Sequence, residues 1–250
     1  MNNLDDASTT VMNKTENPKN LLASPRHTLT LFGILAMLMA AGVLNSSKKI
    51  SASHVPDATQ MIMNDLIMIG LLWLWVVFIY RGMKERSRSI LEFFELKSFT
   101  PTKLLSDFAY AALAFALIYA CSIGLHYFLP DHTSQSNNPL LSSQPDGLLG
   151  VAVWLCISIS AGISEEIVFR GYLQRQLASM TGRVGIAILA QGVAFGIGHA
   201  YEGLNSVLAI MLHGLFLGIL AHWRGNIRAG IIEHAAWDIL AGFGLLSANW

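Results

Sequence analysis

Charged side chains are scarce in this 250-residue chain. Asp, Glu, Lys and Arg make up 13% of it, against roughly 25% in an ordinary soluble domain. Hydrophobic residues reach 53%, and the mean hydropathy is +0.49. This composition leaves too little charge for a surface that faces water on all sides, so it predicts an integral membrane protein. The formal net charge of zero excludes a nucleic-acid partner recruited by bulk electrostatics.

Cysteine is almost absent, and proline is absent after residue 145. Cys121 and Cys156 both fall in apolar runs, which excludes a disulfide framework and a Cys-type zinc site. All 7 prolines precede residue 146, whereas most of the 21 glycines follow it. We therefore interpret residues 147–250 as the functional core, and residues 27–146 as membrane spans and loops that form a scaffold. Close helix packing in the core is indicated by two Gly-x-x-x-Gly pairs, Gly192 with Gly196 and Gly214 with Gly218.

Long apolar segments make up most of the sequence, and a membrane-spanning helix needs about 20 consecutive apolar residues. The sequence predicts an all-α, polytopic bundle of about seven transmembrane helices. Their expected bounds are residues 29–44, 61–80, 108–129, 148–176, 184–201, 204–223 and 227–246.

Lysine and arginine are missing from residues 130–146 and gather in the loops of one side. If the N-terminus lies inside, Lys48 and Lys49 are the only loop cations that face outside, so the positive-inside rule predicts an N-in, C-out orientation. The first 26 residues are polar and contain Pro18 and Pro25, and we expect them to form a disordered cytoplasmic tail.

Ionisable side chains occur at membrane depth in the second half, where each costs about 2.5–3.5 kcal/mol on insertion scales. An apolar run over residues 148–173 contains Glu165, Glu166 and Arg170. Later spans contain His199, His213 and the pair His234 and Asp238. Such expensive groups indicate a functional site.

Helix geometry tests whether these groups can meet. If the fourth span continues to about residue 176 before it turns, Glu165 lies about 16 Å and His199 about 22–24 Å above the turn. Counted from residue 227, His234 and Asp238 lie about 10 and 16 Å up their own helix. Helix tilt can absorb these differences, so the sequence predicts one shared cavity inside the bundle.

The i,i+4 spacing of Glu166 and Arg170, with the acid first, favours an ion pair along the helix. Glu165 is rotated by about 100° and is free to face the cavity as a general base. A buried Glu–Arg pair taken alone is also typical of a structural clamp. His213 is expected to make an interhelical hydrogen bond, and Phe195 to serve packing.

Three ordered motifs resemble those of the CAAX protease and bacteriocin-processing (CPBP, or Abi) family of intramembrane proteases. The family pattern is Glu-Glu-x-x-x-Arg, then Phe-x-x-x-His, then His-x-x-x-Asn/Asp on membrane helices. In this chain the motifs stand as Glu165-Glu166-Ile-Val-Phe-Arg170, Phe195-Gly-Ile-Gly-His199 and His234-Ala-Ala-Trp-Asp238. The resemblance covers residues 147–240, and the first 145 residues carry no recognisable signature.

The resemblance implies an enzyme that hydrolyses a peptide bond in or at the membrane. Glu165 would activate a water molecule with the help of His199, while His234 and the residue at position 238 would stabilise the oxyanion. Glu166 and Arg170 would orient the site. The implied partners are membrane lipid and a membrane-associated peptide or protein, either prenylated or carrying a leader, and the expected location is the plasma membrane of a bacterium.

Asp238 raises the question of a metal. An asparagine could donate a hydrogen bond to an oxyanion, whereas an ionised aspartate cannot. Asp238 must therefore be protonated, orient His234, or bind a metal. Zinc is an open alternative to a metal-free mechanism, with Glu165, His199, His234 and Asp238 as candidate ligands.

Two other classes of function stay open. The polar cluster could assemble a non-catalytic scaffold or binding protein, or it could form the proton relay of a coupled transporter. The absence of prolines from the last three spans, and of an inverted repeat, speaks against the transporter. A His-Glu-x-x-His metalloprotease motif and a Gly-x-Ser-x-Gly serine motif are also absent from the sequence.

Overall fold

The computed structural model describes residues 21–49, 57–95, 100–128, 145–202 and 204–246, and all regular structure within them is helical. The predicted all-α fold is therefore confirmed. The elements in chain order are α2 (Pro25–Lys49), α3 (Ala58–Lys84), η1 (Ile90–Phe94), α4 (Pro101–Phe128), α5 (Gly147–Glu165), η5 (Glu166–Gln174), α6 (Arg175–Thr181), α7 (Val184–Gly198), η6 (Ala200–Glu202), α8 (Leu204–Arg224) and α9 (Arg228–Gly242).

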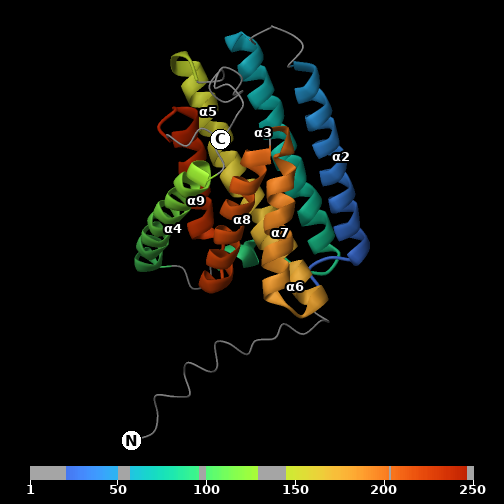
Figure 1. Cartoon of the computed structure of the whole chain (residues 1–250). Coiled ribbons are helices and arrows are strands. Elements are labelled where there is room, and N and C mark those ends of the chain that lie inside the picture. The colour runs from blue at the N-terminus through green and yellow to red at the C-terminus, as the bar shows by residue number, and fades with distance from the viewer. Residues whose placement is uncertain (1–20, 50–56, 96–99, 129–144, 203, 247–250) are drawn as a thin grey trace, which may run out of the picture.

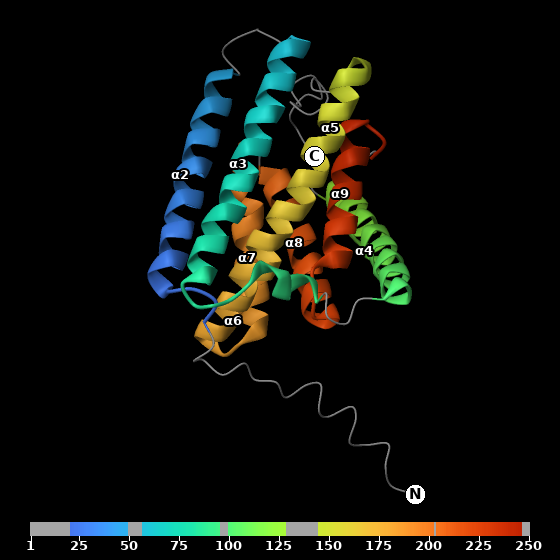
Figure 2. The same ribbon diagram turned by 180° about the vertical axis from the view of Figure 1, so that it is seen from behind.

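The described helices form an elongated bundle (Figure 1). α2 and α3 lie on one flank and α4 and α9 on the other, and the view from behind shows α5 between α3 and α9 (Figure 2). Among the described residues, four helices are long and apolar enough to cross a membrane: Ala58–Lys84, Pro101–Leu125, Gly147–Thr181 and Asn205–Arg224. The shorter α7 is also apolar. Seven spans and the N-in, C-out orientation remain predictions.

One unbroken helix of 35 residues runs from Gly147 to Thr181. Such a continued helix was predicted because it brings Glu165 to the depth of His199. Its middle part, η5, is π-helical, whereas α5 and α6 on either side are α-helical. The helix ends at Gly182, which adopts a left-handed conformation with φ of 67° that a side chain would disfavour. The chain then reverses into α7.

Glycines bring α7 and α8 into close contact, as the Gly-x-x-x-Gly pairs predicted. A β-carbon on Gly196 would lie 2.6 Å from the Val207 carbonyl oxygen, and one on Gly214 would lie 3.1 Å from the Gly192 α-carbon. Bare backbone on both faces therefore permits an approach that other residues would prevent.

The hydrophobic core surrounds η5. Ile167, Val168, Phe169, Tyr172 and Leu173 of this segment are all buried, and they pack with side chains of α2, α3 and η1. All nine residues of η5 are buried. The predicted catalytic segment is thus the centre of the bundle.

A short helix between α3 and α4 covers η5. Ser89 and Glu92 form a reciprocal capping box that starts η1. Phe93 is fully buried against Gly171, whose missing side chain makes room for its ring. The Phe93 carbonyl also accepts a hydrogen bond from the Ile227 amide at 3.1 Å, which ties η1 to the start of α9.

The chain before α2 is held against the same long helix by Gln176, which is fully buried. Its Oε1 accepts from the Leu22 amide at 2.7 Å, and its Nε2 donates to the Ala23 carbonyl at 2.9 Å. Residues 21–26 were expected to end a disordered tail. Within this stretch Gln176 satisfies backbone groups of Leu22 and Ala23, and α2 begins at Pro25. The rest of that predicted tail, residues 1–20, lies outside the described residues.

We expect Gly196→Ala to lower the stability of the bundle by about 1–3 kcal/mol, since the added methyl group overpacks the α7–α8 contact. Thermal unfolding in detergent micelles measures the effect. Gly185→Ala on the same helix is the matched control, because its β-carbon would meet nothing within 4 Å. Equal midpoints for the two variants would contradict the close packing described above.

Candidate functional site

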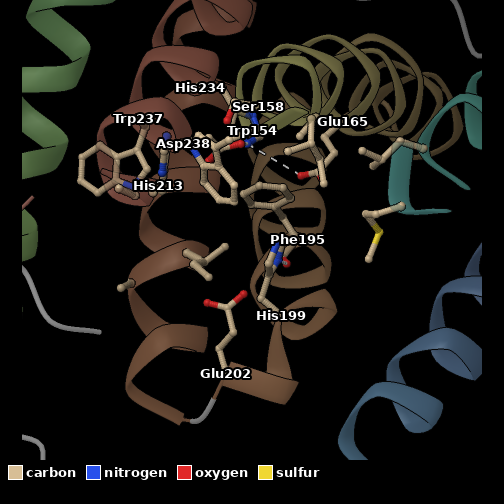
Figure 3. Close-up of a pocket in the computed structure, with 18 of the residues that line it drawn as sticks. Trp154, Ser158, Glu165, Phe195, His199, Glu202, His213, His234, Trp237 and Asp238 are labelled. Atoms are coloured by element: carbon tan, nitrogen blue, oxygen red, sulfur yellow. Dashed lines mark hydrogen bonds and ion pairs between the residues drawn. The ribbon is translucent and has the colours of Figure 1, made fainter. Parts of the chain in front are cut away.

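A cavity of about 230 Å³ lies among α5, α7, η6, α8 and α9. Four of the six predicted site residues line it: Glu165, His199, His234 and Asp238. Figure 3 shows them gathered around the Phe195 ring. The structure therefore brings together residues that are up to 73 positions apart in the sequence, between 165 and 238. Met68 and Leu72 of α3 and Ser122 of α4, all from outside residues 147–250, complete part of the wall.

The other two predicted residues, Glu166 and Arg170, lie beside the cavity and are fully buried. Arg170 Nη1 is 2.7 Å from Glu166 Oε1, so the predicted ion pair is present. The guanidinium also lies over the Phe195 ring, 4.3 Å from its centroid. Gly230 of α9 leaves the space that the Glu166 carboxylate occupies, because a β-carbon there would lie 2.7 Å from Oε2.

His234 is surrounded by three carboxylates. Its Nδ1 lies 3.2 Å from Glu166 Oε1, and since a carboxylate accepts, this nitrogen donates. Its Nε2 faces the cavity, 3.8 Å from Glu165 Oε2 and 3.8 Å from Asp238 Oδ2. Both longer distances exceed a direct hydrogen bond but lie within range of an ion pair. Glu166 therefore sets the orientation of the ring, and Glu165 and Asp238 flank its free edge.

His199 lies just past the end of α7 and is oriented by its own helix. Its Nδ1 is 2.9 Å from the Phe195 carbonyl oxygen, one turn earlier. Because a carbonyl can only accept, Nδ1 carries the proton, and the neutral ring keeps Nε2 as an acceptor. The Phe195 ring packs edge-on against both His199 and His234, with centroids 5.1 and 5.7 Å apart. The predicted packing role of Phe195 is confirmed.

Several site residues were not foreseen. The predicted interhelical hydrogen bond of His213 is present, but its partner, Glu233, was missed. A glutamate directly before a motif histidine in an apolar span was the available signal. Other cavity residues carry no spacing pattern that would have revealed them, namely Trp154, Ser158, Tyr201, Glu202 and Trp237.

The four candidate zinc ligands all reach the cavity, but they do not form a metal centre by position. Within the described part of the chain, no three His, Cys, Asp or Glu side chains are grouped so that they could hold a metal ion. The geometry lends the zinc alternative no support, and we assign no step to a metal.

Arg170→Met should cost about 3–5 kcal/mol of stability, because it leaves the buried Glu166 carboxylate without its cation. The double substitution Glu166→Gln, Arg170→Met should cost less, since it also removes the uncompensated charge. Thermal unfolding in micelles compares both with Arg183→Met at an exposed position. Equal losses for Arg170→Met and Arg183→Met would show that the buried pair does not stabilise the bundle.

Comparison with known proteins adds one match. Residues 147–240 match a family model described as Rce1-like, type II CAAX prenyl endopeptidase Rce1-like. No curated protein and no solved structure matches the chain. The matched range begins with α5 and ends within α9, so it contains all three motifs and nearly all of the helices that line the cavity. Residues 147–240 of this chain are therefore similar to an Rce1-like domain, which is consistent with the CAAX protease family that the motifs resemble.

Proposed function

We propose that this multi-pass membrane protein is an intramembrane endopeptidase that uses Glu165 to activate water. The Rce1-like domain supports a CAAX-type protease as the kind of enzyme. The observation that carries the mechanism is the cavity that Glu165 shares with His199, His234 and Asp238. Glu165 Oε2 has no hydrogen-bond partner among the described residues, and Glu165, unlike Glu166, lines the cavity, so its carboxylate can accept a proton there.

In the first step, Glu165 takes a proton from a water molecule while the water oxygen attacks the scissile carbonyl carbon. His199 assists through Nε2, which can accept the second hydrogen of the water because Nδ1 is engaged with the Phe195 carbonyl. When the C–N bond breaks, the protonated Glu165 returns the proton to the leaving amine. Water is consumed, and no other co-reactant is needed.

His234 and Asp238 stabilise the negative charge that develops on the carbonyl oxygen. For this purpose His234 must carry protons on both ring nitrogens, with Nε2–H directed at the oxyanion. Glu165 and Asp238, each 3.8 Å from that nitrogen, attract the imidazolium form. The role that best fits Asp238 is thus the orientation of His234, and Glu166 with Arg170 completes the support from the other side.

The proposed substrate is a peptide or protein at the membrane, either prenylated or leader-bearing, and the proposed location is the plasma membrane of a bacterium. The cavity walls support an apolar substrate segment, since Met68, Leu72 and Ile157 line it beside the polar groups. We further propose that the reaction proceeds without a metal.

Glu165→Gln should lower kcat by about 10²–10⁴-fold, the usual contribution of a general base, because the amide cannot take the proton. The assay uses a quenched fluorescent peptide with a farnesylated cysteine, and the same peptide without the farnesyl group, in detergent micelles. Wild type should keep its rate after treatment with a chelator. Glu85→Gln, at an exposed position, is the matched control.

Each alternative has its own signature in this experiment. Loss of the wild-type rate in chelator, with recovery on addition of zinc, would replace the metal-free mechanism. An inactive wild type, with a Glu165→Gln variant that folds and assembles normally, would favour a scaffold. Substrate flux in proteoliposomes without cleavage would favour a transporter.

Asp238→Asn should retain kcat within about tenfold, because an amide can both orient His234 and donate to the oxyanion. Asp238→Ala should lose about 10²–10³-fold, because His234, the oxyanion-stabilising group, loses the side chain that orients it. Steady-state kinetics on the same peptides distinguishes the two variants. If asparagine is as damaging as alanine, the carboxylate itself is required, and the orienting role is wrong.

A further inference from the structure

Two buried ionisable residues within the Rce1-like domain lie outside the three motifs. Glu233 of α9 is 1% exposed and His213 of α8 is 6% exposed. Their side chains meet at 2.8 Å between Glu233 Oε2 and His213 Nε2. A buried carboxylate–imidazole pair is a costly way to join two helices, because apolar residues of similar volume often serve stability equally well.

His213 faces the catalytic groups. It lines the cavity together with His234 and Asp238. Its ring centroid lies 5.7 Å from that of His234 and 5.0 Å from that of Trp237, the residue before Asp238. Figure 3 shows His213 beside Trp237, on the same side of the cavity as Asp238. The ring therefore limits the space into which the two side chains of the last motif can turn.

Glu233 fixes how His213 presents that ring. A carboxylate accepts, so His213 Nε2 donates, and one rotation of the imidazole is selected. Glu233 directly precedes His234 on α9, so the helix that carries the catalytic histidine also anchors its neighbour. Two histidines that line the cavity are thus each held by a buried carboxylate behind them, His234 by Glu166 and His213 by Glu233.

Trp237 is packed between His213 and two aromatic residues of α4. Its ring packs against Phe115 and Tyr119 of α4, with centroids 5.2 and 6.3 Å away, and the residue is 8% exposed. His213 therefore contacts a Trp237 ring that α4 already holds in place. Displacement of His213 would be transmitted to the turn of α9 that contains both His234 and Asp238.

We propose that His213 and Glu233 form a positioning pair that holds His234 and Asp238 in the geometry needed for oxyanion stabilisation. The inference rests on the proposed function and adds two residues to its site. Neither residue touches the reacting atoms, and their effect is exerted through His234 and Asp238. A misplacement of a catalytic group by about 1 Å can cost about 10²-fold in rate.

The decisive variant is the double substitution His213→Phe, Glu233→Leu, which replaces the pair by apolar side chains and leaves no buried charge unpaired. We expect kcat on the farnesylated fluorescent peptide to fall by about 10–100-fold. KM and the thermal midpoint in micelles should stay close to wild type. Glu233→Gln should keep kcat within about threefold, because its amide oxygen still accepts from His213.

His222→Phe is the matched control on the same helix, at an exposed position, and should leave all parameters unchanged. If wild type is active and the double variant has the same kcat, the pair only joins α8 to α9. That result would overturn the positioning role but leave the proposed function intact. Equal damage from Glu233→Gln and the double variant would also overturn it, since charge would then matter more than orientation. A wild type without peptidase activity would overturn the proposed function and this inference together.

Discussion

The arrangement of the candidate site depends on the contacts of one carboxylate, that of Glu166. It forms an ion pair with Arg170 on its own helix and accepts a hydrogen bond from His234 on α9, and it fills the space left by Gly230. A carboxylate in an apolar interior must be paired, because an unpaired buried charge is strongly destabilising. Arg170 and His234 both supply that pairing. One side chain thus fixes α9 relative to η5 and directs the free edge of His234 into the cavity. Glu165, the preceding residue, lines the cavity instead of joining this buried cluster.

The π-helical backbone of η5 belongs to the same arrangement. Short π-helical segments are rare and occur frequently at functional sites. Here the segment begins at Glu166, one residue after the proposed base, and all of its residues are buried. Within this segment Arg170 pairs with Glu166, Tyr172 bonds to Thr28 of α2, and Gln174 donates to the Gly218 carbonyl of α8. A single stretch of backbone therefore connects the candidate site to α2 and to α8.

Much of this could be predicted from the sequence, where the signal was local. Apolar length predicted the helices, i,i+4 spacing predicted the Glu166–Arg170 pair, and glycine spacing predicted the α7–α8 contact. The π-helical turn was not predicted, because hydrophobic pattern does not distinguish it from an α-helix. Long-range pairs were missed for a different reason. Asp107 of α4 is buried between Arg224 and Arg228, at 2.7 and 2.6 Å, yet nothing near it in the sequence indicates those partners. Glu233 was also missed, although its place directly before His234 in an apolar span was a signal.

The Gln176 contact has a consequence for where the catalytic unit begins and ends. The Rce1-like range starts at residue 147, but Gln176 within it binds the backbone of Leu22 and Ala23, and Phe93 of η1 fills the hollow at Gly171. The range that matches the family model and the buried core of the bundle therefore do not coincide in this chain. The polar centre of the matched range is enclosed in part by segments that precede it. Residues far ahead of the motifs thus share in keeping water from the buried Glu166–Arg170 pair.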